Sequence, residues 1–81
     1  MKIKKILETK DVEKYLIKRN LIDQYTKVKN FILSGKPKQA KFKKRNPKGS
    51  GFWYFRINKQ FRAIGYFDDQ DFIVFDIDNH Q

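Results

Sequence analysis

Apolar residues recur at helical spacing near the start of the chain. The segment 11–19 places three of them at the i, i+3 and i+4 positions of one helix face: Val12, Tyr15 and Leu16. Thr9 or Asp11 can cap this helix, because both side chains can accept a hydrogen bond from its first turn. Residues 1–7 fit either a short edge strand or an extension of the helix, since the alternation of Ile3 with lysines is too brief to decide.

A second helical stripe follows in the sequence. Its apolar members are spaced three or four residues apart: Leu21, Tyr25, Val28 and Ile32. Asn20 is a suitable N-cap for this helix, and Gly35 followed by Pro37 ends the pattern. The two stripes together predict a helical hairpin with one apolar side.

From Phe52 onward the pattern has a period of two, which is typical of β-strands. Three runs at 52–57, 61–67 and 72–77 are separated by residues 58–60 and 68–70, two segments of hairpin-turn composition. One parity supplies the face expected to pack on the helices: Trp53, Phe55, Ile57, Phe61, Ala63, Gly65, Ile73, Phe75 and Ile77. The predicted fold class is α+β, an N-terminal helical hairpin packed on a small antiparallel meander in a single domain spanning 1–81.

The opposite parity of the meander carries the candidate chemistry. It comprises Tyr54, Arg56, Arg62, Ile64, Tyr66, Asp76 and Asp78, and His80 if the last strand continues. With a three-residue loop at each turn, Arg56 lies opposite Arg62, and Arg62 lies opposite Asp76. Adjacent guanidinium groups repel unless an anion lies between them. That anion is either Asp76, in an ion pair without function, or a bound phosphate that both arginines hold.

His80 is a candidate general acid or base on the same face. Histidine is the side chain whose ordinary pKa lies near neutrality, and its parity places it beside the two arginines. The other interpretation is a solvated chain end, because His80 is the penultimate residue.

Charge changes the picture from an ordinary α+β domain to one with a basic working surface. The formal net charge is +10, and the 44 residues between Asp23 and Asp68 contain twelve Lys or Arg and no carboxylate. The last nineteen residues carry five aspartates and no Lys or Arg. A long segment of one sign favours a partner that supplies the missing negative charge, such as a phosphate backbone.

The centre of the basic segment is the linker at 36–51. It holds seven basic residues: Lys36, Lys38, Lys41, Lys43, Lys44, Arg45 and Lys48. Phe42 lies among them and is expected to hold a short edge strand in place. The linker is either a nucleic-acid surface or a solvated loop with an edge strand that lysines protect from aggregation.

Composition excludes several classes of function. The chain has no cysteine and a single histidine, so neither a disulfide framework nor a thiolate or zinc centre is expected. Eighty-one residues leave no room for a cofactor domain, and no small-molecule cofactor is expected. Apolar runs are too short to span a membrane, and the N-terminus lacks the apolar core of a signal peptide. The sequence therefore predicts a soluble, cytoplasmic protein.

The segment FRINKQFRAIGY at 55–66, followed by an acidic turn and a last strand ending in IDNH at 77–80, resembles the RelE/ParE superfamily of bacterial toxin–antitoxin toxins. Members of this superfamily have an arginine strand, a turn, a Tyr-Arg or Phe-Arg strand, and a final strand leading to His or Tyr. The resemblance covers the meander and, in order and length, the helical hairpin. Phe61 stands where relatives often have a tyrosine.

The resemblance implies a metal-independent mRNA endoribonuclease that acts on the ribosome and is held inactive by an acidic antitoxin protein. In such relatives the ribose 2′-hydroxyl attacks the adjacent phosphate and leaves a 2′,3′-cyclic phosphate. Arg62 matches the clamp of the phosphate and transition state, Arg56 the arginine on the preceding strand, and His80 the acid or base, with Asp78 as its orienter. Candidate RNA contacts are Lys41, Lys43, Lys44, Arg45, Lys59 and Tyr54.

Two other functions remain open at the level of sequence. The ParE branch of the superfamily inhibits DNA gyrase and cuts no RNA, and the fold alone does not choose between the branches. A non-catalytic nucleic-acid-binding module is the second alternative, in which Tyr54 and Tyr66 act as stacking platforms.

Overall fold

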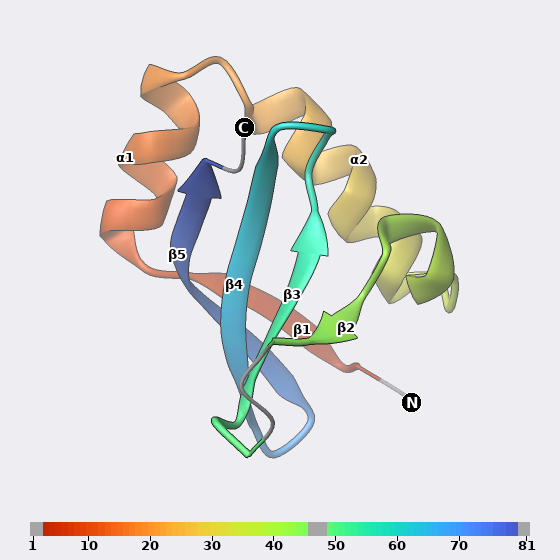
Figure 1. Cartoon of the computed structure of the whole chain (residues 1–81). Coiled ribbons are helices and arrows are strands. Elements are labelled where there is room, and N and C mark those ends of the chain that lie inside the picture. The colour runs from red at the N-terminus through yellow and green to blue at the C-terminus, as the bar shows by residue number, and fades with distance from the viewer. Residues whose placement is uncertain (1–2, 46–48, 80–81) are drawn as a thin grey trace.

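The computed structural model describes residues 3–45 and 49–79 of the chain. Within these ranges, five strands form one sheet, and two α-helices and a short 3-10 helix accompany it (Figure 1). In chain order the elements are β1 (Lys5–Glu8), α1 (Lys10–Lys18), α2 (Ile22–Leu33), η1 (Pro37–Ala40), β2 (Lys43–Lys44), β3 (Phe52–Arg56), β4 (Phe61–Asp68) and β5 (Asp71–Asn79). The α+β class and the helix–helix–meander order are as predicted.

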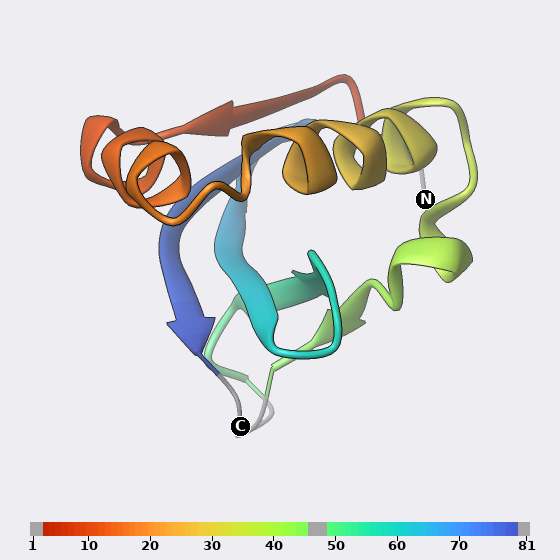
Figure 2. The ribbon, with the colours of Figure 1, turned by 90° about the horizontal axis from the view of Figure 1, so that it is seen from above.

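Both α-helices lie on one side of the sheet (Figure 2). The buried side chains that the helices and the sheet contribute to one cluster are called the main core below; they include Val12, Leu16, Tyr25, Ile32, Phe55, Ala63, Phe72 and Val74. The ring of Tyr25 on α2 lies 5.8 Å from that of Phe55 on β3, and the ring of Tyr15 on α1 lies 6.2 Å from that of Phe61 on β4. The opposite face of β3, β4 and β5, called the outer face below, is turned toward the viewer in Figure 1 and is not covered by either helix.

The sheet is mixed, so the prediction of a purely antiparallel sheet is wrong. Its strand order is β1-β5-β4-β3-β2, and β1 pairs with β5 in parallel, with Ile6 opposite Phe72. The chain between these two strands contains α1, α2, η1 and strands β2 to β4, far more than the roughly dozen residues that a parallel connection requires. Of the two possibilities for residues 1–7, the strand is the one observed, at Lys5–Glu8, and residues 1 and 2 lie outside the described residues. Ile6 is buried in the main core.

Helix α1 begins one residue earlier than predicted and is capped by Thr9. The Thr9 hydroxyl accepts a hydrogen bond from the backbone N–H of Val12 at 3.3 Å, which satisfies a donor that has no partner within the helix. Val12 and Leu16 of the predicted stripe are buried.

The prediction that Asn20 caps the second helix is wrong. Asn20 has a φ of 57°, and the N-cap of α2 is Leu21, whose side chain makes no capping bond. Asparagine tolerates this left-handed conformation better than most residues, so it makes the turn between the helices. At the other end, Gly35 takes a φ of 89° after the helix, as its position in the sequence indicated.

The linker contains more regular secondary structure than its composition suggested. Pro37 begins the 3-10 helix η1, and the short edge strand β2 follows at Lys43–Lys44. Phe42, between them, packs against the main core: its ring lies 5.1 Å from that of Phe72 and 5.4 Å from that of Trp53. Phe42 therefore holds the basic edge strand against the sheet, as predicted.

The hairpin of β3 and β4 has the predicted register, with Arg56 opposite Arg62. Asn58 fixes its turn, because the Asn58 side-chain oxygen accepts hydrogen bonds from the backbone N–H groups of Gln60 and Phe61, both at 2.8 Å. Phe55, Phe61 and Ala63 are buried on the helix side, as the parity predicted.

The register of β5 differs from the prediction. The connection to β4 is a two-residue turn, Asp69 and Gln70, and a bulge interrupts the ladder between Ile64 and Gly65. Gly65 pairs with Val74 and Ile64 with Asp76, so Phe75 is the extra residue. The strands approach closely here: a Cβ on residue 65 would lie 2.7 Å from the Phe72 ring and closer still to the carbonyl oxygen of Ile73.

Two predictions fail because of this register. Phe72 and Val74 occupy the main core, whereas Ile73 and Phe75, which had been assigned to it, do not belong to it. Arg62 lies opposite Asp78 rather than Asp76. The β4–β5 turn is one residue shorter than predicted, and the bulge adds one residue to β5. Together they shift the pairing beyond the bulge by two residues. Because two residues are one full period of a strand, Asp76, Ile77 and Asp78 keep their predicted faces but have different partners on β4.

Candidate nucleic-acid interface

The outer face carries an arginine row at the end of the sheet near the β3–β4 turn. Arg56 and Arg62 are directly opposite each other, and side chains in such a pair leave the sheet on the same side with Cβ atoms about 5 Å apart. Arg56 is exposed and Arg62 is partly exposed. Because the Asn58 turn fixes the register, it also fixes the two arginines on opposite positions of the hairpin.

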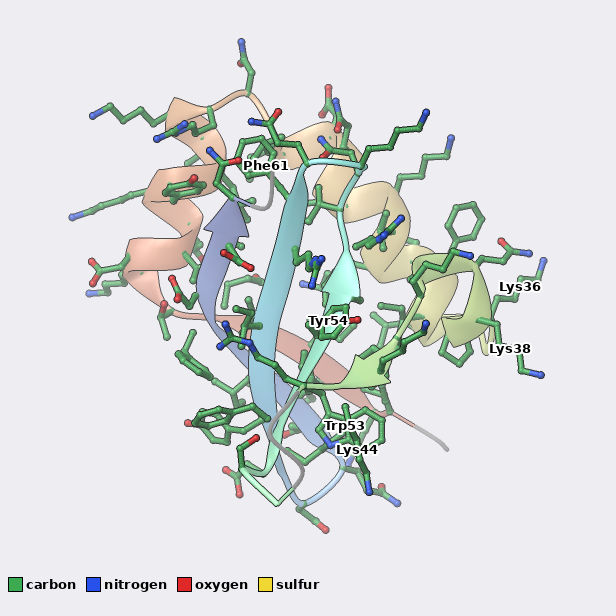
Figure 3. The ribbon with its side chains drawn as sticks, in the orientation of Figure 1. Lys36, Lys38, Lys44, Trp53, Tyr54 and Phe61 are labelled. Carbon is green, nitrogen blue, oxygen red and sulfur yellow. The ribbon has the colours of Figure 1, made fainter. Side chains whose placement is uncertain are left out.

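Arg62 is held by an aromatic ring. Its guanidinium carbon lies 5.0 Å from the ring centroid of Tyr54, which projects from β3 on the same face (Figure 3). A guanidinium stacked on a tyrosine face is attracted by the ring quadrupole and loses part of its freedom. The contact, called the Tyr54–Arg62 stack below, therefore restricts where the Arg62 guanidinium lies.

The arginine row faces Asp78 but forms no ion pair with it. Within the described ranges, the only ion pair joins Lys29 to Glu8, on the helix side of the molecule. Asp76, the earlier candidate for a counter-anion, instead accepts a hydrogen bond from the N–H of Ile77 at 2.9 Å. The site therefore has two arginines on directly opposite positions of neighbouring strands, and neither forms an ion pair with a carboxylate among the described residues.

The basic residues of the linker divide between two surfaces. Lys43 is opposite Tyr54 and shares the outer face with it, whereas Lys44 is opposite Trp53 and lies over that ring at 5.6 Å (Figure 3). Arg45 is joined to β3 by a hydrogen bond from its N–H to the carbonyl oxygen of Phe52 at 2.9 Å. Lys43 is thus the linker lysine that the sheet places beside the Tyr54–Arg62 stack.

The remaining candidates differ in where they lie. Lys59 is in the β3–β4 turn next to the arginine row, whereas Lys41 ends η1 with a φ of 56°, away from it. His80 falls outside the described residues, as does Lys48, so the role of Asp78 as an orienter of His80 stays a prediction. The last described residue, Asn79, accepts a hydrogen bond from Gln60 at 3.0 Å, which ties the end of β5 to the turn beside the arginine row.

Sequence reasoning missed an aromatic cluster on the outer face. The rings of Phe52 and Phe75 are 5.1 Å apart, and those of Tyr66 and Phe75 are 5.9 Å apart. Period-two parity had assigned Phe75 to the core, and the hydrophobic pattern carries no mark of the bulge that turns it outward. Gly65, whose neighbourhood leaves no space for a side chain, is the residue that could have suggested a bulge.

Glu8 forms a polar cluster on the helix side. Its Oε2 accepts hydrogen bonds from the Tyr25 hydroxyl at 2.8 Å and from the Lys29 ammonium at 2.9 Å. Burial, followed by the neighbouring Glu8 carboxylate, raises the pKa of Tyr25 well above its ordinary value. The cluster joins β1 to α2 and keeps this carboxylate away from the outer face.

A groove of about 340 Å³ runs beside this cluster between the two helices. Its apolar lining includes Leu16, Ile17 and Ile22, and Ile17 is 65% exposed. Isolated exposed apolar residues are common on soluble proteins, but here they line a concave surface. The groove is a second candidate interface, on the opposite side of the molecule from the arginine row.

Comparison with known proteins adds no relative to these observations. A scan against models of protein families matches none of them, and a search of curated proteins finds no match. Among the described residues, no helix has the length and apolar character needed to cross a membrane. The same residues contain no group of three or more His, Cys, Asp or Glu side chains suited to a metal ion.

Proposed function

We propose that this protein is the toxin of a bacterial type II toxin–antitoxin pair and acts in the cytoplasm as a ribosome-dependent mRNA endoribonuclease. The observation that carries the proposal is the arginine row, in which Arg56 and Arg62 occupy directly opposite positions on an uncovered face and no described carboxylate is paired with them. A phosphodiester satisfies both groups, because each guanidinium can donate two parallel hydrogen bonds to phosphate oxygens.

The proposed reaction is an intramolecular phosphoryl transfer within the RNA. The ribose 2′-oxygen loses its proton and attacks the adjacent phosphorus, the bond to the 5′-oxygen breaks, and that oxygen takes up a proton. The products end in a 2′,3′-cyclic phosphate and a 5′-hydroxyl. Negative charge grows on the phosphoryl oxygens in the transition state, where a preorganised Arg62 stabilises it most strongly.

The other residues have supporting roles in this proposal. Arg56 holds the ground-state phosphate, and His80 donates or accepts the proton with Asp78 as its orienter. Phe61, at the position where related toxins often carry a tyrosine, is buried against Tyr15 and contributes packing rather than proton transfer. Lys43 contacts the phosphate backbone of the RNA beside the Tyr54–Arg62 stack.

The groove between the helices supports the proposed partner, an acidic antitoxin. A segment of that protein would place apolar side chains along Leu16, Ile17 and Ile22, while its carboxylates reach the arginine row. The formal charge of +10 favours such a partner and accelerates its association. If a neighbouring gene encodes a small acidic protein, co-expression of the two should yield one complex. Elution as two separate proteins at low salt would contradict this part of the proposal.

Induced expression in bacteria tests the function without any assumption about the antitoxin. We expect rapid loss of amino-acid incorporation with continued DNA synthesis. Arrested replication with filamentous cells would indicate gyrase inhibition, and unimpaired growth would indicate a non-catalytic binding module; both results would contradict the proposal. For expression of the Arg62→Ala variant, Arg19→Ala provides a matched control. Arg19 lies on the helix side, and its guanidinium is 4.8 Å from the Tyr15 ring, much as that of Arg62 is 5.0 Å from the Tyr54 ring.

A further inference from the structure

The aromatic cluster of Phe52, Tyr66 and Phe75 joins three strands of the outer face. Phe52 on β3 is directly opposite Tyr66 on β4, and Phe75 comes from the bulge in β5. Because β4 lies between β3 and β5, the contact between the Phe52 and Phe75 rings passes over β4. The three rings therefore form one continuous aromatic surface across the sheet.

The cluster is separate from the main core and is only partly covered. Ile64, on the same face of β4, is 1% exposed, so the outer face has a small apolar centre of its own. In contrast, 38% of Phe52 and 40% of Tyr66 remain exposed. Burying Ile64 does not require this much exposed aromatic surface, and partly exposed rings are characteristic of binding surfaces.

The order of side chains along β4 indicates which partner the cluster fits. The arginine row is at one end, the Tyr54–Arg62 stack comes next, and Tyr66 follows four residues after Arg62, about 13 Å farther along a strand. Beyond Tyr66 the β4–β5 turn is acidic, with Asp68 opposite Asp71. Phosphates are attracted to the first end and repelled from the second, so the aromatic end suits the uncharged bases of a strand whose backbone is held at the arginines.

We infer that Phe52, Tyr66 and Phe75 form a nucleobase-stacking platform for single-stranded RNA whose backbone occupies the arginine row. This inference rests on the proposed function, because it takes the phosphate at Arg56 and Arg62 as its starting point. Bases stack on aromatic side chains whatever their sequence, so the platform adds affinity and position rather than sequence preference. It places the reacting phosphate at a fixed distance from the stacked bases.

The test measures binding of a short single-stranded RNA with 2′-O-methyl riboses, which cannot be cleaved through the 2′-oxygen. Tyr66→Leu keeps an apolar side chain but removes the ring, and Tyr66→Phe keeps the ring. We expect Tyr66→Leu to weaken binding about tenfold or more and Tyr66→Phe to leave it nearly unchanged. Phe52→Leu repeats the test at the neighbouring ring. Thermal melting of each variant checks that it is folded.

A second ligand separates stacking from other causes. A strand of equal length with abasic nucleotides keeps its phosphates, so we expect Tyr66→Leu to bind it as the wild type does, whereas Arg62→Ala should bind both strands more weakly. If the wild type and Tyr66→Leu bind the normal strand equally well, the inference is overturned. It is also overturned if Tyr66→Leu loses as much affinity for the abasic strand as for the normal strand. Loss of antitoxin binding with RNA affinity intact would also overturn it, because the platform would then fit a protein.

The outcome for Arg62→Ala distinguishes the two levels of the proposal. If Arg62→Ala weakens RNA binding but Tyr66→Leu does not, the stacking platform fails and the phosphate site stands. If neither change alters binding, the proposed RNA site and the platform fail together.

Discussion

At the scale of single residues, the proposed activity depends on how Arg62 is held. Charge alone does not distinguish it from the other eighteen basic residues of the chain. It differs in lying opposite a second arginine and in stacking on Tyr54. A guanidinium combines a planar fork, which matches two phosphoryl oxygens, with a flat face that stacks on an aromatic ring, and an ammonium group has neither.

Arg62→Lys tests this use of geometry. The substitution keeps the positive charge but removes the fork and its stacking, so we expect mRNA cleavage to fall about a hundredfold, as for loss of one oriented transition-state donor. The affinity for RNA should fall much less, because the charge remains. Single-turnover cleavage rates together with binding isotherms separate the two quantities. A cleavage rate close to that of the wild type would show that Arg62 acts only as a point charge.

At the scale of elements, the helices and the β3–β4 hairpin follow from the sequence because their signals are local. The stripe on α1, the Thr9 cap and the Asn58 turn each involve residues a few positions apart. The parallel pairing of β1 with β5 is not local: the partners are more than 60 residues apart, and a four-residue strand carries too short a pattern to specify them. For this reason the sheet type was predicted incorrectly.

The candidate site also divides into a part that local signals predict and a part that they do not. The facing arginines depend only on the hairpin of β3 and β4, and that prediction is confirmed. The partner of Arg62 on β5 depends on the turn length and the bulge, and that prediction is wrong. A bulge changes the face of Phe75 without leaving a trace in the hydrophobic pattern, since Phe and Ile suit either side of a sheet.

The corrected register of β5 predicts which substitutions destabilise the fold. Val74 is fully buried, so Val74→Ala should lower the free energy of unfolding by about 1 to 3 kcal/mol through lost burial and a residual cavity. Ile73→Ala removes more carbon atoms from a partly exposed site and should cost less. Chemical denaturation of both variants measures the difference. A larger effect at Ile73 would favour the simple alternation over the observed bulge.

The Tyr25–Glu8 contact between α2 and β1 predicts sensitivity to alkaline pH. The folded protein raises the pKa of Tyr25 above the ordinary value of about 10, so unfolding releases a proton once the pH exceeds that value. The stability that the protonated hydroxyl contributes is complete below about pH 10 and is lost as the pH rises further. Tyr25→Phe should lower the melting temperature at pH 8 and narrow its gap to the wild type at pH 11. An unchanged gap would contradict this linkage.

At the scale of the whole molecule, the fold separates two surfaces that differ in charge and chemistry. The arginine row and Lys43 lie on the outer face, while Glu8 is paired with Lys29 near the groove between the helices. The proposed RNA and the apolar part of the proposed antitoxin therefore use opposite sides. Inhibition would then require that an antitoxin segment extend around the sheet to the arginine row.

The arrangement of the two β2 lysines predicts different effects on the salt dependence of RNA binding. Lys43→Gln should reduce the slope of log affinity against log salt by about 0.7, the value for one phosphate contact to a single strand. Lys44→Gln removes the same charge on the Trp53 side and should leave the slope nearly unchanged. Titrations at several salt concentrations compare the two variants. Equal slopes for both would show that the lysines act only through net charge.

The most direct test of the central claim is primer extension on an mRNA translated in a reconstituted system with the purified protein. We predict cuts within the translated region for the wild type and for Arg19→Ala, with products ending in a 2′,3′-cyclic phosphate and a 5′-hydroxyl. Arg62→Ala should produce no cuts. An mRNA left intact by the wild-type protein, or cut as efficiently by Arg62→Ala, would contradict the assignment of the arginine row as an RNA-cleaving site.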